Sequence, residues 1–217
     1  MSSTPALVIP QSLREEAANA LSHGLGCLLA AASLPVLLAS GWLPARPGSV
    51  VGAAVFALTM TLVYLASTVY HALPPGRAKQ WLNRVDHAAI FLFIAGSFTP
   101  FALRNLDSDN GLVAFGLVWL LALLGIVCKA GGGLRCPLRS TLLYVALGWV
   151  AAAAALPTLA VLSAGQILLI AGGGAAYMVG AVFFLIDHRL RYSHFIWHLF
   201  VLAGSGCHFT AALQHLT

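Results

Sequence analysis

The chain has 217 residues, of which 60% are hydrophobic and only 8% are charged. An ordinary soluble domain carries roughly 25% charged residues, so this composition excludes a water-soluble globular protein and places most of the surface in a lipid bilayer. The net charge of +5 comes from basic residues scattered between apolar segments. This distribution excludes the continuous basic stripe that is typical of nucleic-acid-binding proteins.

Apolar segments long enough to cross a membrane recur seven times along the chain. A spanning helix needs about 20 mostly apolar residues, and polar residues, Gly and Pro separate the segments of this kind. The predicted spans are Asn19 to Ser40, Ser49 to His71, Asp86 to Leu103, Gly111 to Cys128, Thr141 to Leu162, Gln166 to Ile186 and His194 to Leu213. We therefore expect an all-α membrane protein, with residues 1–217 in a single seven-helix transmembrane domain and residues 1–18 as a short cytoplasmic N-terminal segment.

The basic residues predict the orientation of this bundle. Cytoplasmic loops hold the excess of Lys and Arg, and alternating loops divide these residues nine to two. The majority side holds Arg14, Arg77, Lys79, Arg84, Lys129, Arg135, Arg139, Arg189 and Arg191, and the minority side holds Arg46 and Arg104. We expect the N-terminus in the cytoplasm and, with seven spans, the C-terminus outside.

Histidines gather near the predicted cytoplasmic ends of the spans, where ionisable side chains in a membrane protein usually mark function. His194 and His198 are one helical turn apart, so their imidazoles project from one face about 6 Å apart and can hold one ion. His71, at the end of the second predicted span, can supply a third nitrogen. Three His ligands and one open position are typical of a catalytic zinc site that activates water.

Two further residues complete this predicted site. Asp86 can orient a water molecule or accept its proton, and Ser67, one turn before His71, adds a hydroxyl group. Simpler interpretations stand beside these. Histidines at a membrane interface often only keep their polar tips in water, and Asp86 can be the N-cap of its helix.

Other polar residues are given no catalytic role. Glu15 and Glu16 suit the first turn of a helix, and His208 is expected to pack or hydrogen-bond within the bundle. The roles of His23 and His87 stay open. A haem held between facing histidines is an alternative cofactor. The four cysteines form no CxxC pair and are interpreted as small apolar fillers.

An ordered set of motifs resembles the bacterial haemolysin III proteins, which are relatives of the progestin and adipoQ receptors and, more distantly, of alkaline ceramidases. The matching positions are Glu15, Glu16, Asn19 and His23; Ser67 and His71; Asp86, His87 and Gly96-Ser97-Phe98-Thr99-Pro100; and Ser193, His194, His198, His208 and Phe209. These positions run from the first predicted span to the last, so the resemblance covers nearly the whole chain.

The resemblance implies a seven-helix bundle with its N-terminus inside and a zinc ion held by His71, His194 and His198. It also implies that Asp86 holds the zinc-bound water and that Ser67 lies beside it. A multi-pass protein of the bacterial cytoplasmic (inner) membrane is the expected localisation. Membrane lipids are the expected partners, and no nucleic acid is expected.

Three functions compete at this point. The first is a zinc-dependent hydrolase that acts on a lipid amide or ester and contributes to membrane-lipid homeostasis. The second is a non-enzymatic, receptor-like membrane regulator in which zinc is structural. The third is a haemolysin or pore-forming protein, which the family name suggests, although the spans lack the recurring polar stripe of a water-filled channel.

Overall fold

The computed structural model describes residues 11–42, 47–103, 106 and 108–216. These residues form eight helices and no strand: α1 (Leu13–Trp42), α2 (Pro47–Ala72), α3 (Arg77–Ala102), α4 (Asp109–Ala130), α5 (Pro137–Ala154), α6 (Leu156–Leu159), α7 (Ala164–Leu185) and α8 (Ser193–Leu216). All except α6 are long and apolar enough to cross a membrane. The predicted all-α protein with seven spans is therefore confirmed.

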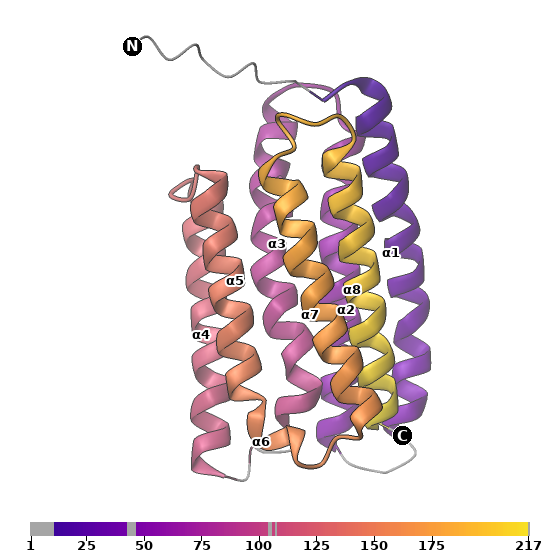
Figure 1. The fold of residues 1–217 in the computed structure, drawn as a ribbon, viewed down its shortest axis with the longest axis vertical. Coiled ribbons are helices and arrows are strands. Elements are labelled where there is room, and N and C mark those ends of the chain that lie inside the picture. The colour runs from indigo at the N-terminus through magenta and orange to yellow at the C-terminus, as the bar shows by residue number, and fades with distance from the viewer. Residues whose placement is uncertain (1–10, 43–46, 104–105, 107, 217) are drawn as a thin grey trace.

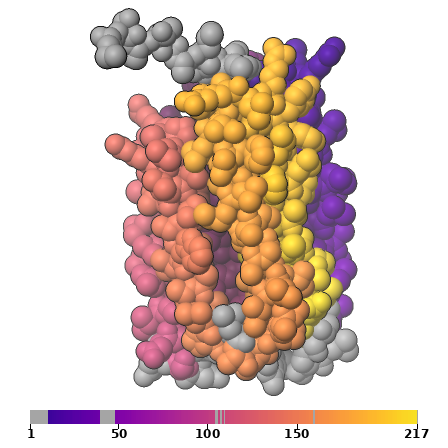
Figure 2. Space-filling model, in the orientation of Figure 1, coloured from indigo at the N-terminus to yellow at the C-terminus, as the bar shows by residue number. Residues whose placement is uncertain are grey.

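The seven long helices run alternately up and down the bundle (Figure 1). Helix α1 packs against α2 and α8, α3 packs against α2, and α7 packs against α8. Helices α4 and α5 form a pair at one side, where both contact α3. The space-filling view shows α5 and α7 together on the face turned to the viewer (Figure 2).

Burial follows the pattern expected when lipid, not water, surrounds the protein. The side chains of Asn19, Ser67 and His198 are at most 1% exposed. Apolar side chains such as Leu13, Val113 and Leu168 are 70% to 86% exposed. Because a polar group gains nothing from contact with hydrocarbon, these polar side chains turn into the bundle.

Local sequence signals explain where several helices begin. Ser163 opens α7 with a capping box, in which its hydroxyl accepts a hydrogen bond from the Gln166 backbone N–H and the Gln166 side chain accepts one from Ser163 N–H. Ser12 and Glu15 make the same reciprocal pair at the start of α1. Each pair satisfies backbone donors that the first helical turn leaves without partners.

Two predicted spans need correction. Helix α3 begins at Arg77 rather than Asp86, because the segment before Asp86 is rich in good helix formers and continues the helix beyond the apolar stretch. Asp86 is therefore inside the helix, and its interpretation as an N-cap is wrong. The fifth predicted span, Thr141 to Leu162, is divided into α5 and the short α6, because the chain leaves the α5 helix around Ala155.

The other predicted spans differ from the observed helices by only a few residues, except that α1 begins six residues earlier, at Leu13. The last six residues of the predicted N-terminal segment 1–18 therefore belong to this helix. The nine basic residues of the majority side lie on α1, α3, α4 and α5 or in the connections at one end of the bundle (Figure 1). Arg46 and Arg104 lie outside the described residues, and which membrane face this end occupies stays a prediction.

Candidate metal centre

Three histidines from two distant parts of the chain meet near one end of the bundle. His71 lies in the last turn of α2, and His194 and His198 lie in the first turns of α8. All three are buried, and their potential ligand atoms lie within 4.8 Å of one another. We call His71, His194 and His198 the histidine cluster. The structure thus brings together the three ligands that the sequence predicted.

Carboxylates fix the protonation of two of these rings. His71 Nδ1 lies 2.8 Å from Glu16 Oε2 on α1, and His194 Nδ1 lies 3.0 Å from Asp187 Oδ2 in the connection between α7 and α8. A carboxylate only accepts hydrogen bonds, so Nδ1 of each ring carries the proton and donates. The lone pair of each neutral ring is then on Nε2, the usual tautomer of a metal ligand.

The third ring is oriented by a hydroxyl and a carbonyl group. His198 Nδ1 lies 3.1 Å from Ser22 Oγ and 3.3 Å from the carbonyl oxygen of Asn19. The Ser22 hydroxyl proton is already donated to the Asn19 carbonyl. Ser22 Oγ and the carbonyl therefore both accept from His198 Nδ1–H, and Nε2 again keeps its lone pair.

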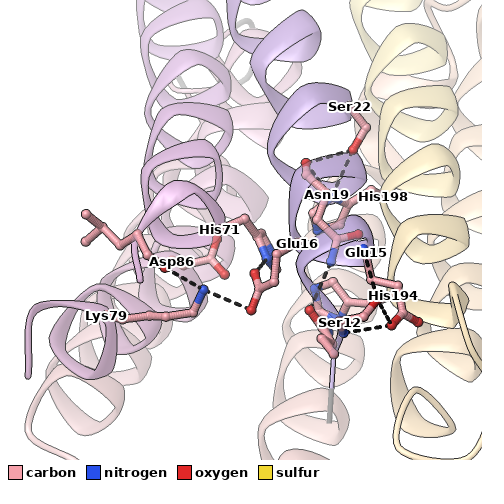
Figure 3. A network of polar contacts seen from close by, with 12 residues as sticks. Ser12, Glu15, Glu16, Asn19, Ser22, His71, Lys79, Asp86, His194 and His198 are labelled. Atoms are coloured by element: carbon pink, nitrogen blue, oxygen red, sulfur yellow. Dashed lines mark hydrogen bonds and ion pairs between the residues drawn. The ribbon is translucent and has the colours of Figure 1, made fainter. Parts of the chain in front are cut away.

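The donor set fits a metal ion. Each of the three rings keeps an Nε2 lone pair, their potential ligand atoms lie close together, and His71 Nε2 has no hydrogen-bond partner among the described residues. Buried acceptors without a donor are costly, whereas a divalent cation would satisfy all three at once. Figure 3 shows the His71, His194 and His198 side chains with Glu16, Asn19 and Ser22, which orient two of the rings.

Asp86 and Ser67 are buried near the cluster without belonging to it. The Asp86 carboxyl interacts electrostatically with both His194 and Lys129. The Ser67 hydroxyl is close enough to interact with Asp86, but it forms no hydrogen bond of regular geometry among the described residues. Both side chains thus have polar atoms available for a bound molecule, while their predicted catalytic roles stay predictions.

The remaining histidines have distinct surroundings. The ring of His23 stacks on that of His198, with centroids 3.5 Å apart, and neither of its nitrogens has a hydrogen-bond partner among the described residues. His87 Nδ1 lies 2.7 Å from the Asn83 carbonyl oxygen. His208 Nε2 lies 3.3 Å from the Ile170 carbonyl oxygen, which confirms the expectation that it bonds within the bundle.

The cysteines are all free. Cys27 and Cys207 are half-buried and suit the interpretation as fillers, whereas Cys128 and Cys136 are exposed. For these two the interpretation is wrong, because an exposed thiol fills no gap between helices.

Sequence reasoning missed the groups that orient the cluster. Glu16 was expected only to suit a helix start, and it binds both His71 and Lys79. Asp187 and Ser22 were given no role. The signal was available for Asp187, because a ligating His needs an acceptor for its second nitrogen and the chain has only six acidic residues.

Glu15 also does more than cap its helix. Its Oε1 accepts a hydrogen bond of 2.7 Å from the backbone N–H of Tyr192, a residue whose positive φ of 58° turns the chain into α8. This bond ties the start of α8, and hence His194, to the start of α1. The sequence spacing of 177 residues gives no local signal for such a contact.

The fold and the histidine cluster define a multi-pass membrane protein with a buried candidate metal centre near one end of a seven-helix bundle. Comparison with known proteins agrees with the resemblance found in the motifs. The chain belongs to the family described as haemolysin-III related, which matches residues 11–209.

Individual relatives support this assignment. The chain is 37% identical to hemolysin-3 of Bacillus cereus over 206 residues, which cover 95% of this chain and 94% of that protein. It is 39% identical to the hemolysin-3 homolog of Bacillus subtilis (strain 168) over 205 residues, 93% of this chain and 94% of the relative. Human monocyte to macrophage differentiation factor is 27% identical over 173 residues, 75% of this chain and 69% of the relative, which supports the relation to progestin and adipoQ receptors. No solved structure matches.

Proposed function

We propose that this protein is a zinc-dependent hydrolase that cleaves an amide or ester bond of a membrane lipid in the bacterial cytoplasmic membrane and so contributes to lipid homeostasis. The observation that carries this proposal is the number of ligand atoms. The cluster offers three among the described residues, and no carboxylate or thiolate joins them as a fourth. A structural zinc site usually has four protein ligands, whereas a catalytic site keeps one position open.

The surroundings of the cluster suit hydrolysis. Zinc in such a site would act as a Lewis acid and activate a water molecule for attack. Asp86 would accept the proton from the attacking water and deliver it to the leaving group. Ser67 would donate a hydrogen bond to the oxygen that gains negative charge, because its hydroxyl is buried and has no regular hydrogen bond.

The position of the site favours a lipid substrate. His71 is in the last turn of its span, and His194 is in the first turn of another. The ends of spanning helices lie near the lipid headgroups, where the amide and ester bonds of lipids are found. Apolar side chains such as Leu21 and Leu25 are exposed on α1 close to this end, so an acyl chain can approach without crossing water.

The proposal is tested by incubating purified, zinc-loaded protein with a panel of lipid amides and esters, with and without a chelator. We expect turnover of at least one lipid class that stops on chelation and in the His71→Ala variant. Turnover by His71→Ala at the wild-type rate would refute the assignment. Absence of turnover across the panel by zinc-loaded protein would count against hydrolysis itself.

A second candidate is a receptor-like regulator in which zinc is structural. It is favoured by the way that the cluster and its acceptors connect α1, α2 and α8, which are distant in the chain but adjacent in the bundle. This candidate predicts that chelation lowers the melting temperature by many degrees while no lipid is turned over. An unchanged melting temperature after complete removal of the metal would exclude it.

A further inference from the structure

A second polar site lies beside the candidate metal centre, on the side of α3 and α4. It is an open cavity of about 640 Å³. Its lining includes Tyr70, Lys79, Asn83, Arg84, Lys129 and Arg135. Four of these six are cationic, and no carboxylate belongs to the lining. We call this the basic cavity.

The buried cation of the basic cavity forms no ion pair with a described carboxylate, although Asp86 interacts with it electrostatically over a longer distance. Lys129 is only 7% exposed, and its Nζ donates to the Leu134 carbonyl oxygen at 2.9 Å and to Ser140 Oγ at 3.0 Å. No carboxylate lies within ion-pair distance of it among the described residues. A lysine that served only to set topology could extend into water, where its charge costs little. A buried ammonium without a contacting carboxylate therefore favours an anion at this place.

Two guanidinium groups converge on the same part of the lining. Arg135 Nε donates a hydrogen bond of 3.1 Å to the carbonyl oxygen of Gly132. The guanidinium carbon of Arg84 lies 3.6 Å from the point that a Cβ of Gly132 would occupy. Gly132 has a positive φ of 78°, a conformation that favours glycine and turns the chain tightly between α4 and α5. Both arginines are exposed, so solvent screens much of their mutual repulsion, and an anion between them would remove more of it.

The fourth cation connects the basic cavity with the histidine cluster. Lys79 Nζ lies 2.9 Å from Glu16 Oε1, and the other oxygen of the same carboxylate accepts from His71. Asp86 couples the two sites, since it interacts electrostatically with both His194 and Lys129. A molecule held in the basic cavity would therefore lie next to the candidate metal centre.

We propose that the basic cavity binds the phosphate group of a lipid headgroup. Planar guanidinium groups match phosphate oxygens with paired hydrogen bonds, and a buried ammonium adds a third positive contact. The cavity is at the helix ends, where headgroup phosphates lie. One last step rests on the proposed hydrolase activity. If that activity holds, the basic cavity would hold the phosphate of a phospholipid substrate while the acyl linkage of the same lipid reaches Asp86 and the histidine cluster.

The test is a binding titration of purified protein in neutral detergent by microscale thermophoresis. Dihexanoyl phosphatidic acid is the main probe, dihexanoyl glycerol is the probe without phosphate, and inorganic phosphate is the free anion. The double variant Arg84→Gln/Arg135→Gln removes two lining charges. Arg139→Gln is the matched control, because Arg139 is exposed at the same end of the bundle but does not line the basic cavity.

We expect the double variant to bind phosphatidic acid at least about tenfold more weakly than wild type, and Arg139→Gln to bind within about twofold. Dihexanoyl glycerol should bind poorly to all three proteins. Equally tight binding of inorganic phosphate would support the same site with a soluble anion as its source. No binding of either phosphate probe, or equal weakening in Arg139→Gln, would overturn the proposal.

A chelator distinguishes this proposal from the proposed hydrolase activity. The basic cavity takes no ligand from the histidine cluster, so metal-stripped wild-type protein should bind phosphatidic acid within about threefold of untreated protein. Retained binding together with absent turnover would leave the basic cavity standing and remove the hydrolase. Turnover without any phosphate binding would support the hydrolase and remove the basic cavity as a phosphate site.

Discussion

Two regions of the bundle are held together in different ways. One is the end that contains the histidine cluster, and the other is the α4–α5 pair. Around the cluster, contacts between α1, α2 and α8 are polar and directional, as in the bonds from His71 to Glu16 and from His198 to Ser22. Between α3, α4 and α5, the buried contacts are mainly apolar and depend on shape, as with Phe91, Val118 and Leu147.

Polar contacts position the side chains of the histidine cluster, whereas apolar packing holds the α4–α5 pair in place. Lipid is as apolar as the side chains of the α4–α5 pair, so burying them adds little hydrophobic stabilisation and close fit does most of the work. The polar contacts of the other region cost desolvation and specify one arrangement. We therefore expect substitutions in the first region to change metal binding and chemistry, and those in the second to change stability alone.

The largest expected effect is on turnover. Asp86→Asn should lower the rate of lipid hydrolysis by about 10²- to 10⁴-fold, because it removes the group proposed to move the proton. Zinc content should stay near the wild-type value, since Asp86 is not part of the histidine cluster. Measured together, rate and metal content separate a catalytic role from a ligand role. A variant that loses its zinc would show that Asp86 supports the site rather than the reaction.

A smaller effect is expected where the carboxylates orient the rings. Glu16→Gln and Asp187→Asn should each weaken zinc affinity by about 10- to 100-fold, because an amide can place a donor against Nδ1 and disturb the tautomer. Competition with a zinc-binding dye gives the affinity. Arg14→Gln is the control from the same helical turn, since Arg14 is exposed and contacts neither the rings nor their acceptors. Equal losses in all three variants would mean that the effect is on folding.

The α4–α5 pair should respond differently. A Cβ at Gly125 on α4 would lie 2.5 Å from the nearest atom of the Phe91 ring, so Gly125→Leu should destabilise the protein by about 1–3 kcal/mol through overpacking. Gly116→Leu on the same helix is the control, because nothing lies within 4 Å of its Cβ position. Thermal unfolding and zinc content are measured for both variants. Zinc lost by Gly125→Leu while the fold persists would break the proposed separation of the two regions.

The smallest effect is expected at the start of α7. Ser163→Ala removes a capping box far from the histidine cluster and should cost about 1 kcal/mol of stability. Zinc affinity and turnover should not change. The melting temperature and the zinc titration of the same sample check both statements, and a weakened zinc affinity would show that the far end of the bundle is coupled to the site.

Much of this architecture could be predicted from the sequence. Apolar length alone gave the seven spans, and helical spacing placed His194 and His198 on one face. Hydropathy could not show that α3 begins at Arg77, because its first turns are polar helix formers outside the apolar stretch. Hydropathy also could not divide the fifth span, although Pro157, two residues past the break near Ala155, is a helix-breaking signal in the sequence.

The candidate site was predicted less completely than the fold. His71, His194 and His198 were identified from residue type and from their place at span ends. The acceptors were missed because Glu16 and Ser22 reach the rings across 55 and 176 residues of chain, and their effect depends on which face of α1 turns inward. The stacking of His23 on His198 depends on the same rotation of α1, so the sequence could not predict it either.

Elemental analysis of purified protein tests the central claim most directly. Wild type should contain about one equivalent of zinc, as a single three-histidine site requires. His71→Ala, His194→Ala and His198→Ala should each lose most of it. His208→Ala should keep it, because His208 is a half-buried histidine that bonds to Ile170 instead. Wild-type protein that contains no transition metal after growth with added zinc, or full zinc retention in His71→Ala or His194→Ala, would contradict the account.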